Sequence, residues 1–501
     1  MSTPAAPGGA EAEAEVTAWL AARTRPPIET AISRVFLGDD VAYKLKRHVS
    51  LGYVEFGTPE RRLWALEREL SFNQRTCDIY RRLIPITRAA AGGLEWEGPG
   101  EVVDYALEMR RFDDRAVLAS APEALDGDMA EALGRTVAGF HKSAPLKPQG
   151  GLTALAFTIG SNAQLLRELA PELGRDLVED LVARTEAELE RQAALLAHRS
   201  AAGFARQCHG DLHLGNILVE QGRPVVFDCI EFNDLLSDLD VQYDLAFLLM
   251  DLEFRGRRDA AVRVLSAYLD EAARSFPPEL WDGLAALPLM LSVRAGVRAH
   301  VSAHSADVAT ARRYVEAGVA HLSPAPPTLV AVGGLSGSGK STFARAVAPH
   351  IGASPGAVVL RTDEIRKRLL GVPPTHALSR DHYTPSSQGQ TYDAMIRDAR
   401  ALLGAGRAVV LDATFLDAGL RRRVEQLARD AGVAFEGVWL DAPPDVLERR
   451  VAGRTGDASD ADLAVLRGQL ARLGEIAADW PAVDVSGPTE AAAAAWLARR
   501  G

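Results

Sequence analysis

The chain has 501 residues, which is too long for a single hydrophobic core and indicates two or three domains. Its apolar content of 47% and charged content of 25% are those of an ordinary globular protein. A net charge of −11 argues against a protein that coats nucleic acid or an anionic membrane. The 3 cysteines are scattered without metal-ligand or disulfide spacing, and neither a signal peptide nor a membrane span is expected, so we expect a cytoplasmic protein.

The first part of the chain combines strand-like and helical patterns. Residues 1–27 are mostly small and polar at their start, and we expect them to form a flexible segment. Residues 41–46 alternate as a strand does, and residues 58–74 predict a helix with a threonine cap and a proline in its first turn. Residues 101–112 predict a further strand followed by a crossover.

The middle of the chain is mostly helical in pattern. Residues 127–200 are rich in alanine and leucine, and residues 238–322 return to helical periodicity. Between them, residues 205–232 contain two short apolar runs after a polar loop, which predicts a hairpin. The proline-rich stretch 323–327 predicts a linker, beyond which buried strands alternate with helices. That alternation is typical of a parallel α/β sheet.

The polar loop before the hairpin reads HGDLHLGN over residues 209–216. Phosphoryl transfer requires a carboxylate that orients and deprotonates a hydroxyl, and oxygen ligands that hold Mg²⁺. Asp211 and Asn216 have the spacing of the kinase catalytic loop, and Asp228 follows at the end of the second hairpin strand, where it can supply another metal carboxylate. The pattern favours a kinase-like site over a set of polar turn residues that only satisfy one another.

This loop resembles that of the aminoglycoside phosphotransferase and choline kinase branch of the protein-kinase-like fold. The resemblance implies that Asp211 is the catalytic base and that Asn216 and Asp228 bind Mg²⁺. His209 and His213 would then brace the loop. It also implies a two-lobed α+β domain over residues 28–322, with an N-lobe of about residues 28–108 and a C-lobe of about residues 113–322.

A kinase-like C-lobe requires an N-lobe that binds ATP. VAYK matches the pattern of the strand that carries the phosphate-binding lysine, which is Lys44 here, with Lys46 on the same face as the second candidate. The acidic partner on the following helix is either Glu67 or Glu69, and the sequence does not separate them. No glycine-rich loop precedes the lysine, since Gly38 stands alone, and this departure leaves room for a pseudokinase.

A second motif, GLSGSGKS, occupies residues 334–341, between an apolar strand and a helix. It satisfies the P-loop pattern, in which backbone N–H groups hold phosphates at a helix N-terminus, a lysine reaches the β- and γ-phosphates and a serine binds Mg²⁺. The candidate nucleotide-binding residues are Gly334, Ser336, Gly337, Ser338, Gly339, Lys340, Ser341 and Thr342, with Ser341 also a candidate metal ligand.

The remainder of residues 328–501 narrows the type of this second domain. Asp363 and Arg366 share a helix face and resemble the Asp-x-x-Arg element of small P-loop kinases and polynucleotide kinases, which implies an acceptor-activating aspartate. Asp412 ends a buried strand at a position resembling Walker B, where it would bind Mg²⁺. Arg450 and Arg454 resemble lid arginines that face the transferred phosphate; a solvated basic helix face is the alternative interpretation.

The sequence as a whole indicates two phosphoryl-transfer sites that use ATP and Mg²⁺. The order of the halves resembles a bacterial two-domain family in which a phosphotransferase-like domain is fused to a predicted P-loop kinase. The leading hypothesis is a bifunctional enzyme whose acceptors are small-molecule hydroxyls. In one alternative, the N-terminal half is a nucleotide-sensing pseudokinase that regulates the other half. A nucleic-acid 5′ end is a further candidate acceptor for the P-loop half.

Overall fold

The computed structural model describes residues 9–51, 54–453, 459–471 and 479–500. Contacts divide the chain into two compact units. The first consists of Met1–Ala124, Ala144–Ala154 and Ala205–Asp240, and the second of Leu125–Ser143, Leu155–Phe204 and Val241–Gly501. The HGD loop therefore belongs to the first unit, and the P-loop belongs to the second.

The first unit is built on an antiparallel sheet, which has six strands within the described residues. In sheet order these are β1 (Ile28–Glu29), β2 (Ser33–Leu37), β3 (Val41–Lys46), β8 (Val102–Arg110), β6 (Tyr80–Arg88) and β7 (Leu94–Trp96). A small hairpin of β4 (Ser50–Leu51) and β5 (Val54–Glu55) lies outside this sheet. The expected strand over residues 41–46 is confirmed as β3.

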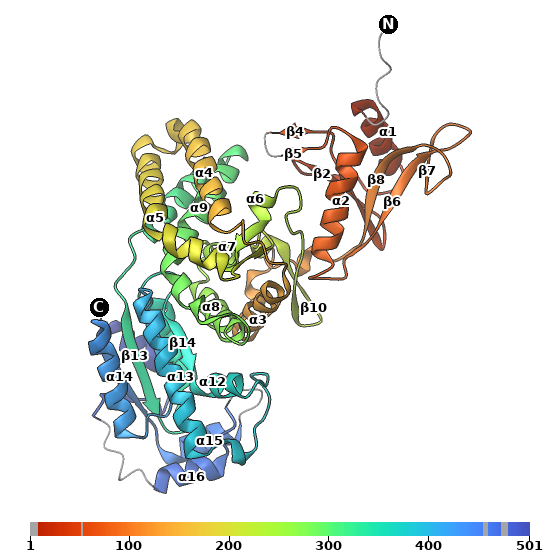
Figure 1. Ribbon diagram of the computed structural model, residues 1–501. Helices are drawn as coiled ribbons and strands as arrows, with labels where there is room; N and C mark the ends of the chain where they lie inside the picture. Colours follow the sequence, from red (N-terminus) through yellow and green to blue (C-terminus); the bar gives the residue numbers. More distant parts are fainter. Residues whose placement is uncertain (1–8, 52–53, 454–458, 472–478, 501) are drawn as a thin grey trace. The chain divides into compact units, whose positions relative to one another are not determined.

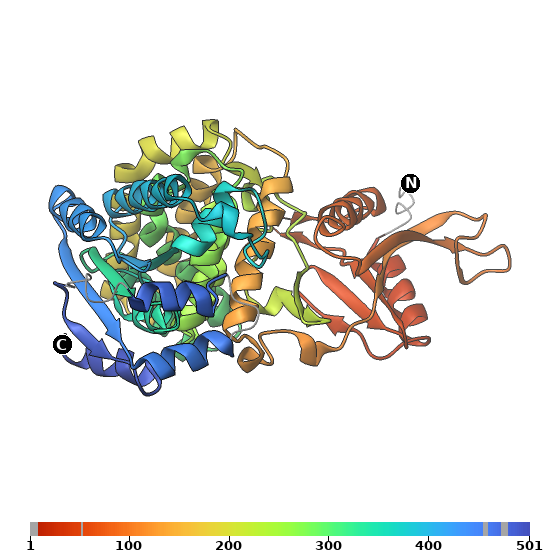
Figure 2. The same cartoon turned by 90° about the horizontal axis from the view of Figure 1, so that it is seen from below.

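Helices cover both faces of this sheet (Figure 2). Helix α2 (Pro59–Asn73) begins after Thr58, whose side chain accepts a hydrogen bond from the backbone N–H of Arg61, as the sequence predicts. Leu66 of α2 packs with Ala42 and Leu107 on one face. On the other face, Val16 and Leu20 of α1 (Ala10–Ala21) pack in the core with strand residues of the sheet.

The structure differs here from the flexible N-terminal segment that the sequence predicts. Residues 10–21 form a helix, and Val16 and Leu20 are 0% and 1% exposed. The sequence predicts flexibility because the stretch begins with small and polar residues, and two apolar residues one turn apart are a weak signal for a helix.

The remaining elements of the first unit carry the polar loop. Strands β10 (Ile217–Glu220) and β11 (Arg223–Val226) form the predicted hairpin. The 3₁₀ turn η3 (Leu214–Asn216) precedes it, and α6 (Asp234–Ser237) follows it. Strand β9 (Ala205–Gln207) directly precedes the polar loop and pairs with β12 (Asp238–Asp240). The sequence did not predict this pairing, because each strand has only three residues.

The second unit begins with helices that the sequence predicts as helical stretches. They are α3 (Gly127–Ser143), α4 (Leu152–Leu173, whose first residues lie in the other unit), α5 (Arg175–Ala201), α7 (Val241–Phe254), α8 (Arg258–Ala272), α9 (Leu287–His304) and α10 (Val308–His321). Within the part of the chain that the structure describes, the segment Pro278–His304 is long and apolar enough to cross a membrane by length and composition. However, 78% of the most apolar 18-residue stretch of this segment is buried inside the protein, as in a core helix.

The rest of the second unit is an α/β fold on a parallel sheet, which has five strands among the described residues. In sheet order they are β14 (Val358–Arg361), β15 (Val409–Asp412), β13 (Thr328–Gly334), β16 (Ala434–Asp441) and β17 (Ala482–Asp484). The helices among the described residues of this part are α11 (Lys340–Val347), α12 (Thr362–Leu369), α13 (Pro385–Gly404), α14 (Ala418–Ala431), α15 (Pro444–Ala452), α16 (Leu463–Ala471) and α17 (Thr489–Ala498) (Figure 1). The predicted fold class, a kinase-like α+β domain followed by a parallel α/β P-loop domain, is confirmed.

Candidate functional sites

The HGD loop of the first unit has a fixed backbone. Gly210 has a φ of 85°, and a Cβ atom there would lie 2.5 Å from the carbonyl oxygen of Leu236, so the loop needs glycine at this position. The buried ring of His209 accepts a hydrogen bond from the N–H of Asp211 at Nδ1 (3.2 Å). Its Nε2 lies 2.8 Å from the carbonyl oxygen of Phe227, to which it therefore donates. His209 thus links the loop to the hairpin strand that follows.

Asp211 is held by two neighbours. The side-chain amide of Asn216 donates to the backbone oxygen and to Oδ2 of Asp211, at 2.9 and 3.0 Å. His213 accepts from the N–H of Gly215 at Nδ1, which leaves Nε2 as the protonated nitrogen, 3.3 Å from Asp211 Oδ2. The predicted bracing by both histidines agrees with these contacts.

Two lysines of β3 meet one carboxylate of α2. Lys44 Nζ lies 2.6 Å from Oε1 of Glu69, and Lys46 Nζ lies 2.6 Å from Oε2 of the same residue. Glu69 is fully buried, whereas Glu67 is exposed on the outer face of α2. The structure therefore brings Glu69 to the lysines and leaves Glu67 away from them.

Two acids of the segment after β11 complete this cluster. Asp228 Oδ1 lies 2.7 Å from Lys44 Nζ, and Glu231 Oε1 lies 2.6 Å from Lys46 Nζ. Burial alone would lower the pKa values of the two lysines, but the carboxylates around them outweigh it and raise both. Both lysines therefore remain charged, and each has a carboxylate on either side.

Asp228 has an uncommon backbone conformation. Its φ is 63°, in the left-handed region that residues other than glycine seldom adopt. Its N–H donates to the hydroxyl of Tyr80 (3.1 Å), and the next N–H, of Cys229, donates to Oδ1 of Asn73 (3.0 Å). The side chain of Asp228 is 43% exposed, so one of its oxygens remains available to a cation. Sequence reasoning missed Tyr80, which follows no recognised pattern, and such backbone support is not visible in a linear motif.

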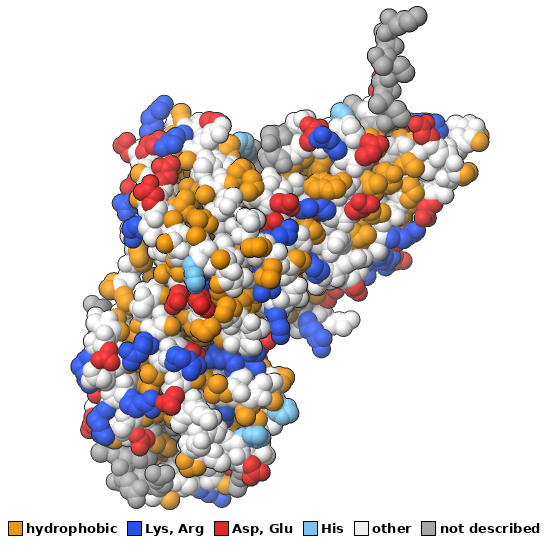
Figure 3. All heavy atoms as spheres, viewed as in Figure 1, with side chains coloured by type: hydrophobic (Ala, Val, Ile, Leu, Met, Phe, Trp, Pro, Cys, Tyr) orange, Lys and Arg blue, Asp and Glu red, His pale blue; other side chains and the backbone are white. Residues whose placement is uncertain are grey.

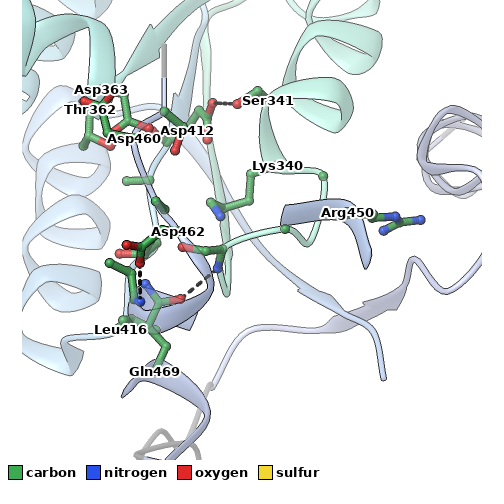
Figure 4. Close-up of a pocket in the computed structure, with 18 of the residues that line it drawn as sticks. Lys340, Ser341, Thr362, Asp363, Asp412, Leu416, Arg450, Asp460, Asp462 and Gln469 are labelled. Carbon is green, nitrogen blue, oxygen red and sulfur yellow. Dashed lines mark hydrogen bonds between the residues drawn. The ribbon is translucent and has the colours of Figure 1, made fainter. Parts of the chain in front are cut away.

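The P-loop of the second unit lines a cleft of about 1250 Å³ (Figure 4). Gly337 and Gly339 have φ values of 83° and 84°, and Cβ atoms there would lie 2.7 Å from the Leu447 oxygen and 2.5 Å from Thr489 Oγ1. Ser336, Lys340, Ser341 and Thr342 line the same cleft. Gly334 and Ser338 are buried behind it, with a Gly334 Cβ position 2.7 Å from Ser338 Oγ. The loop shape requires its glycines, as a phosphate cradle does.

The candidate metal ligands of this cleft are in contact. Ser341 Oγ lies 2.6 Å from Oδ2 of Asp412, and Lys340 Nζ donates to the carbonyl oxygen of Leu335 (2.8 Å). A hydroxyl next to a carboxylate at the start of a helix is the oxygen donor set that suits Mg²⁺, so the residues present fit the ion. Asn216 and the partly exposed Asp228 supply a comparable amide and carboxylate set in the first unit.

The predicted acceptor residues lie at the same cleft. Arg366 donates to Asp363 Oδ1 at 2.9 Å, and its guanidinium carbon lies 4.6 Å from the ring centre of Tyr383. The hydroxyl of Tyr383 donates to Asp460 (2.7 Å), and burial together with this carboxylate raises the pKa of the tyrosine. Sequence reasoning missed Tyr383 and Asp460, because the fold brings them to Asp363 from distant segments.

The candidate lid arginines have a different placement. Arg450 lines the cleft but donates to the carbonyl oxygen of Gly487 at 2.6 Å, and Figure 4 shows its guanidinium directed away from Lys340. Arg454 lies outside the described residues. A side-chain oxygen of Gln469 in α16 accepts from the N–H of Ser336 at 2.8 Å, a contact with the P-loop that no sequence motif indicated.

Two family models match the chain. The phosphotransferase enzyme family matches residues 58–287, and an AAA domain model matches residues 329–476. The first match contains the HGD loop and the second contains the P-loop.

Relatives share either the whole layout or one half of it. An uncharacterized protein of Mycobacterium tuberculosis is 31% identical over 486 residues, which are 92% of each chain. The adenylyl-sulfate kinase of Myxococcus xanthus is 34% identical over 136 residues, which cover 27% of this chain and 69% of that enzyme. Among solved structures, a choline/ethanolamine kinase family protein of Mesorhizobium loti is 15% identical with a TM-score of 0.36, covering 62% of this chain and 94% of its own.

Proposed function

Because the chain belongs to a bacterial family in which a phosphotransferase-type domain precedes a P-loop kinase domain, we propose that it is a bifunctional, ATP-dependent phosphotransferase. Each half would transfer the γ-phosphoryl group of ATP to a hydroxyl group of a small molecule in the cytoplasm. The observation that carries the proposal is the presence of two separate sets of residues of the types that phosphoryl transfer uses. One is built around Asp211 in the first unit, and the other around Lys340 and Asp363 in the second.

In the N-terminal half, Asp211 would accept the proton of the acceptor hydroxyl. As the hydroxyl oxygen bonds to the γ-phosphorus, the bond between that phosphorus and the β,γ-bridging oxygen breaks and ADP leaves. Asn216 and Asp228 would hold Mg²⁺, which neutralises charge on the phosphates when it is bound. Lys44, fixed between Glu69 and Asp228, would hold phosphate oxygens of the nucleotide.

In the P-loop half, Asp363 would take the corresponding role of base. Arg366 orients Asp363 through an ion pair and would contact the acceptor or its phosphate. Lys340 would leave its present partner, the Leu335 oxygen, for the nucleotide phosphates, and Ser341 with Asp412 would hold Mg²⁺. The ion pair fixes the base before substrate binds, as an orienting group should.

The charges around the P-loop cleft favour a small acceptor over an oligonucleotide. A nucleic-acid acceptor needs a continuous surface of unpaired cations. Lys and Arg side chains do gather over α13 and α14 (Figure 3), but three of these arginines each contact a carboxylate. Arg397, Arg400 and Arg423 contact Asp398, Asp430 and Asp393, respectively.

A panel of acceptors tests the proposal. Purified full-length protein with ATP and Mg²⁺ would be incubated with amino sugars, aminoglycosides, choline-like alcohols, nucleosides and 5′-hydroxyl oligonucleotides, and products would be identified by mass spectrometry. We expect phosphorylated small molecules. Phosphorylation of oligonucleotides alone would replace the small-molecule assignment of the P-loop half. Transfer that depends only on the P-loop half would favour a sensing role for the N-terminal half.

A further inference from the structure

Arg361 contacts both candidate magnesium ligands of the P-loop half. It is the last residue of β14 and lies in register with Asp412, the last residue of β15. Its Nε lies 3.2 Å from Asp412 Oδ2, and its Nη2 lies 3.1 Å from Ser341 Oγ. The side chain is 4% exposed. One planar guanidinium therefore fixes the two oxygen donors that would bind the ion.

The remaining nitrogen of Arg361 faces the helices of the other family match. Its Nη1 donates to Oε1 of Glu364 at 3.1 Å, and the same oxygen lies 3.5 Å from Nη2 of Arg135 in α3. Glu131, one turn earlier in α3, forms an ion pair with Arg345 of α11, the helix that begins at Lys340. Glu364 thus lies between Arg135 of α3 and Arg361 of β14. Glu131 lies in the same way between Arg263 of α8 and Arg345 of α11.

Helix α8 joins the same edge of the parallel sheet. Val262 is part of the hydrophobic core that contains Val330 and Val359. Ser266 Oγ accepts a hydrogen bond from the N–H of Val359 in edge strand β14 at 3.1 Å. All these residues lie within the second compact unit. Helix α8 therefore covers the strand that ends in Arg361, and both α8 and α3 belong to the residues matched by the phosphotransferase family.

We propose that Arg361 is a positioning residue for the magnesium ligands of the P-loop half, and that Glu364 and Arg135 connect it to helix α3 of the phosphotransferase half. The inference rests on the proposed function only in requiring that the P-loop site bind a divalent cation with nucleotide. It assigns a series of contacts through which a displacement of α3 would change the positions of the metal ligands at that site.

The connection follows from orientation and charge. A carboxylate that binds a metal is oriented by the groups that donate to it, and loss of such a group typically weakens metal binding about 10- to 100-fold. A guanidinium next to a cation site also repels the cation, and Glu364 offsets this charge. Displacement of Arg135 would remove one of the two arginines that contact Glu364. The positions of Glu364 and Arg361 would then change.

Binding of Mn²⁺ tests the proposal without any turnover. Mn²⁺ affinity would be measured by electron paramagnetic resonance on the full-length protein with saturating ADP. The Mn²⁺ binding that disappears in Lys340→Ala is assigned to the P-loop site and is called the P-loop component. We expect Arg361→Met and Glu364→Gln to weaken this component about 10- to 100-fold. Arg135→Met should weaken it severalfold. Arg361→Lys, which keeps the charge but cannot make all three contacts, serves if Arg361→Met does not fold, and should weaken it at least severalfold.

Arg368→Met is the matched control. Arg368 is a buried arginine of the same segment that bonds Asp270 of α8 at 3.1 Å and also contacts Asp398, away from Ser341 and Asp412. We expect its Mn²⁺ affinity within twofold of wild type. Equal losses in Arg368→Met and Arg361→Met would mean general loosening and would overturn the proposal, as would unchanged affinity in Arg361→Met or in Arg135→Met. A wild-type protein without a Lys340-dependent Mn²⁺ component would instead overturn the proposed function of the P-loop half.

Discussion

His213 Nε2 lies 3.3 Å from Oδ2 of Asp211, and the ring is oriented by the N–H of Gly215, which donates to Nδ1 at 3.0 Å. Two residues of one short motif are thus a candidate base and the group that holds it. This relationship explains why the loop contains a histidine two residues after its aspartate.

Replacement of His213 should therefore impair transfer more than nucleotide binding. For His213→Ala, we expect kcat of the N-terminal half to fall about 10- to 100-fold, because a misplaced base costs roughly that much. The KM for ATP should remain within about twofold. Steady-state kinetics with an acceptor from the panel measure both. Asp211→Asn is the reference, with an expected loss of about 100- to 10,000-fold. A His213→Ala enzyme with wild-type kcat would exclude the orienting role.

Glu69 should contribute strongly to folding stability. Its carboxylate is fully buried between Lys44 and Lys46, so Glu69→Gln removes the charge that both cations share. Breaking a buried ion pair from one side costs about 3–5 kcal/mol, and we expect a loss of that order in the free energy of unfolding of the transition that includes the first unit. Urea denaturation followed by circular dichroism measures it.

Glu67→Gln is the matched control for this measurement. The two glutamates lie on the same helix, but Glu67 is exposed, so its substitution should change the free energy of unfolding by no more than about 0.5 kcal/mol. Similar values for the two variants would show that the lysine cluster does not depend on Glu69.

The backbone of the P-loop should not tolerate a side chain at Gly339. A Cβ atom there would lie 2.5 Å from Thr489 Oγ1 on a backbone with a φ of 84°. Backbone strain of this kind costs about 1–3 kcal/mol, so Gly339→Ala should weaken the Lys340-dependent binding of ATP about 10-fold or more. Calorimetric titration measures the affinity. Gly404→Ala is the control, since a Cβ atom at Gly404 meets no atom within 4 Å. Equal affinities in the two variants would contradict the importance of the loop shape.

The contribution of Asp270 in α8 to the folding stability should depend on pH. Burial and the nearby Glu364 raise the pKa of Asp270 to about 6, despite Arg368 and Arg274. An unfolded chain has an ordinary carboxyl pKa of about 3.9, so the folded state binds more protons between these values. This group therefore adds stability as the pH falls through about 6 toward 4, and that contribution is lost as the pH rises again.

Asp270→Asn should remove this contribution. We expect the difference in unfolding free energy between wild type and Asp270→Asn to shift in favour of the wild type by about 1–3 kcal/mol as the pH falls from 7 to 4. Denaturation curves of both proteins at several pH values give this difference. The contributions of the titrating groups that the two proteins share cancel in it. A difference that stays constant with pH would contradict a raised pKa for Asp270.

Local motifs could be predicted from the sequence, and contacts between distant segments could not. The strand with Lys44, the helix after Thr58 and the P-loop each depend on neighbours in the chain, so periodicity and spacing reveal them. Glu69 could not be distinguished from Glu67 because both fit the helix, and only the packing of α2 on the sheet selects one.

The parts that escaped prediction depend on tertiary packing. Helix α1 forms because Val16 and Leu20 reach a sheet that their own sequence does not indicate. Tyr80 supports Asp228 from a strand far away in the chain, and Asp460 reaches Tyr383 from a segment after α15. Each of these contacts joins residues whose separation no motif specifies.

The most direct test of two independent phosphoryl-transfer sites compares the two base variants. ATP turnover would be measured for the wild type, Asp211→Asn and Asp363→Asn, each with an acceptor for each half from the panel. We predict that Asp211→Asn abolishes transfer to one acceptor and spares the other, and that Asp363→Asn does the reverse. Loss of both activities in either variant would contradict the account of two independent sites.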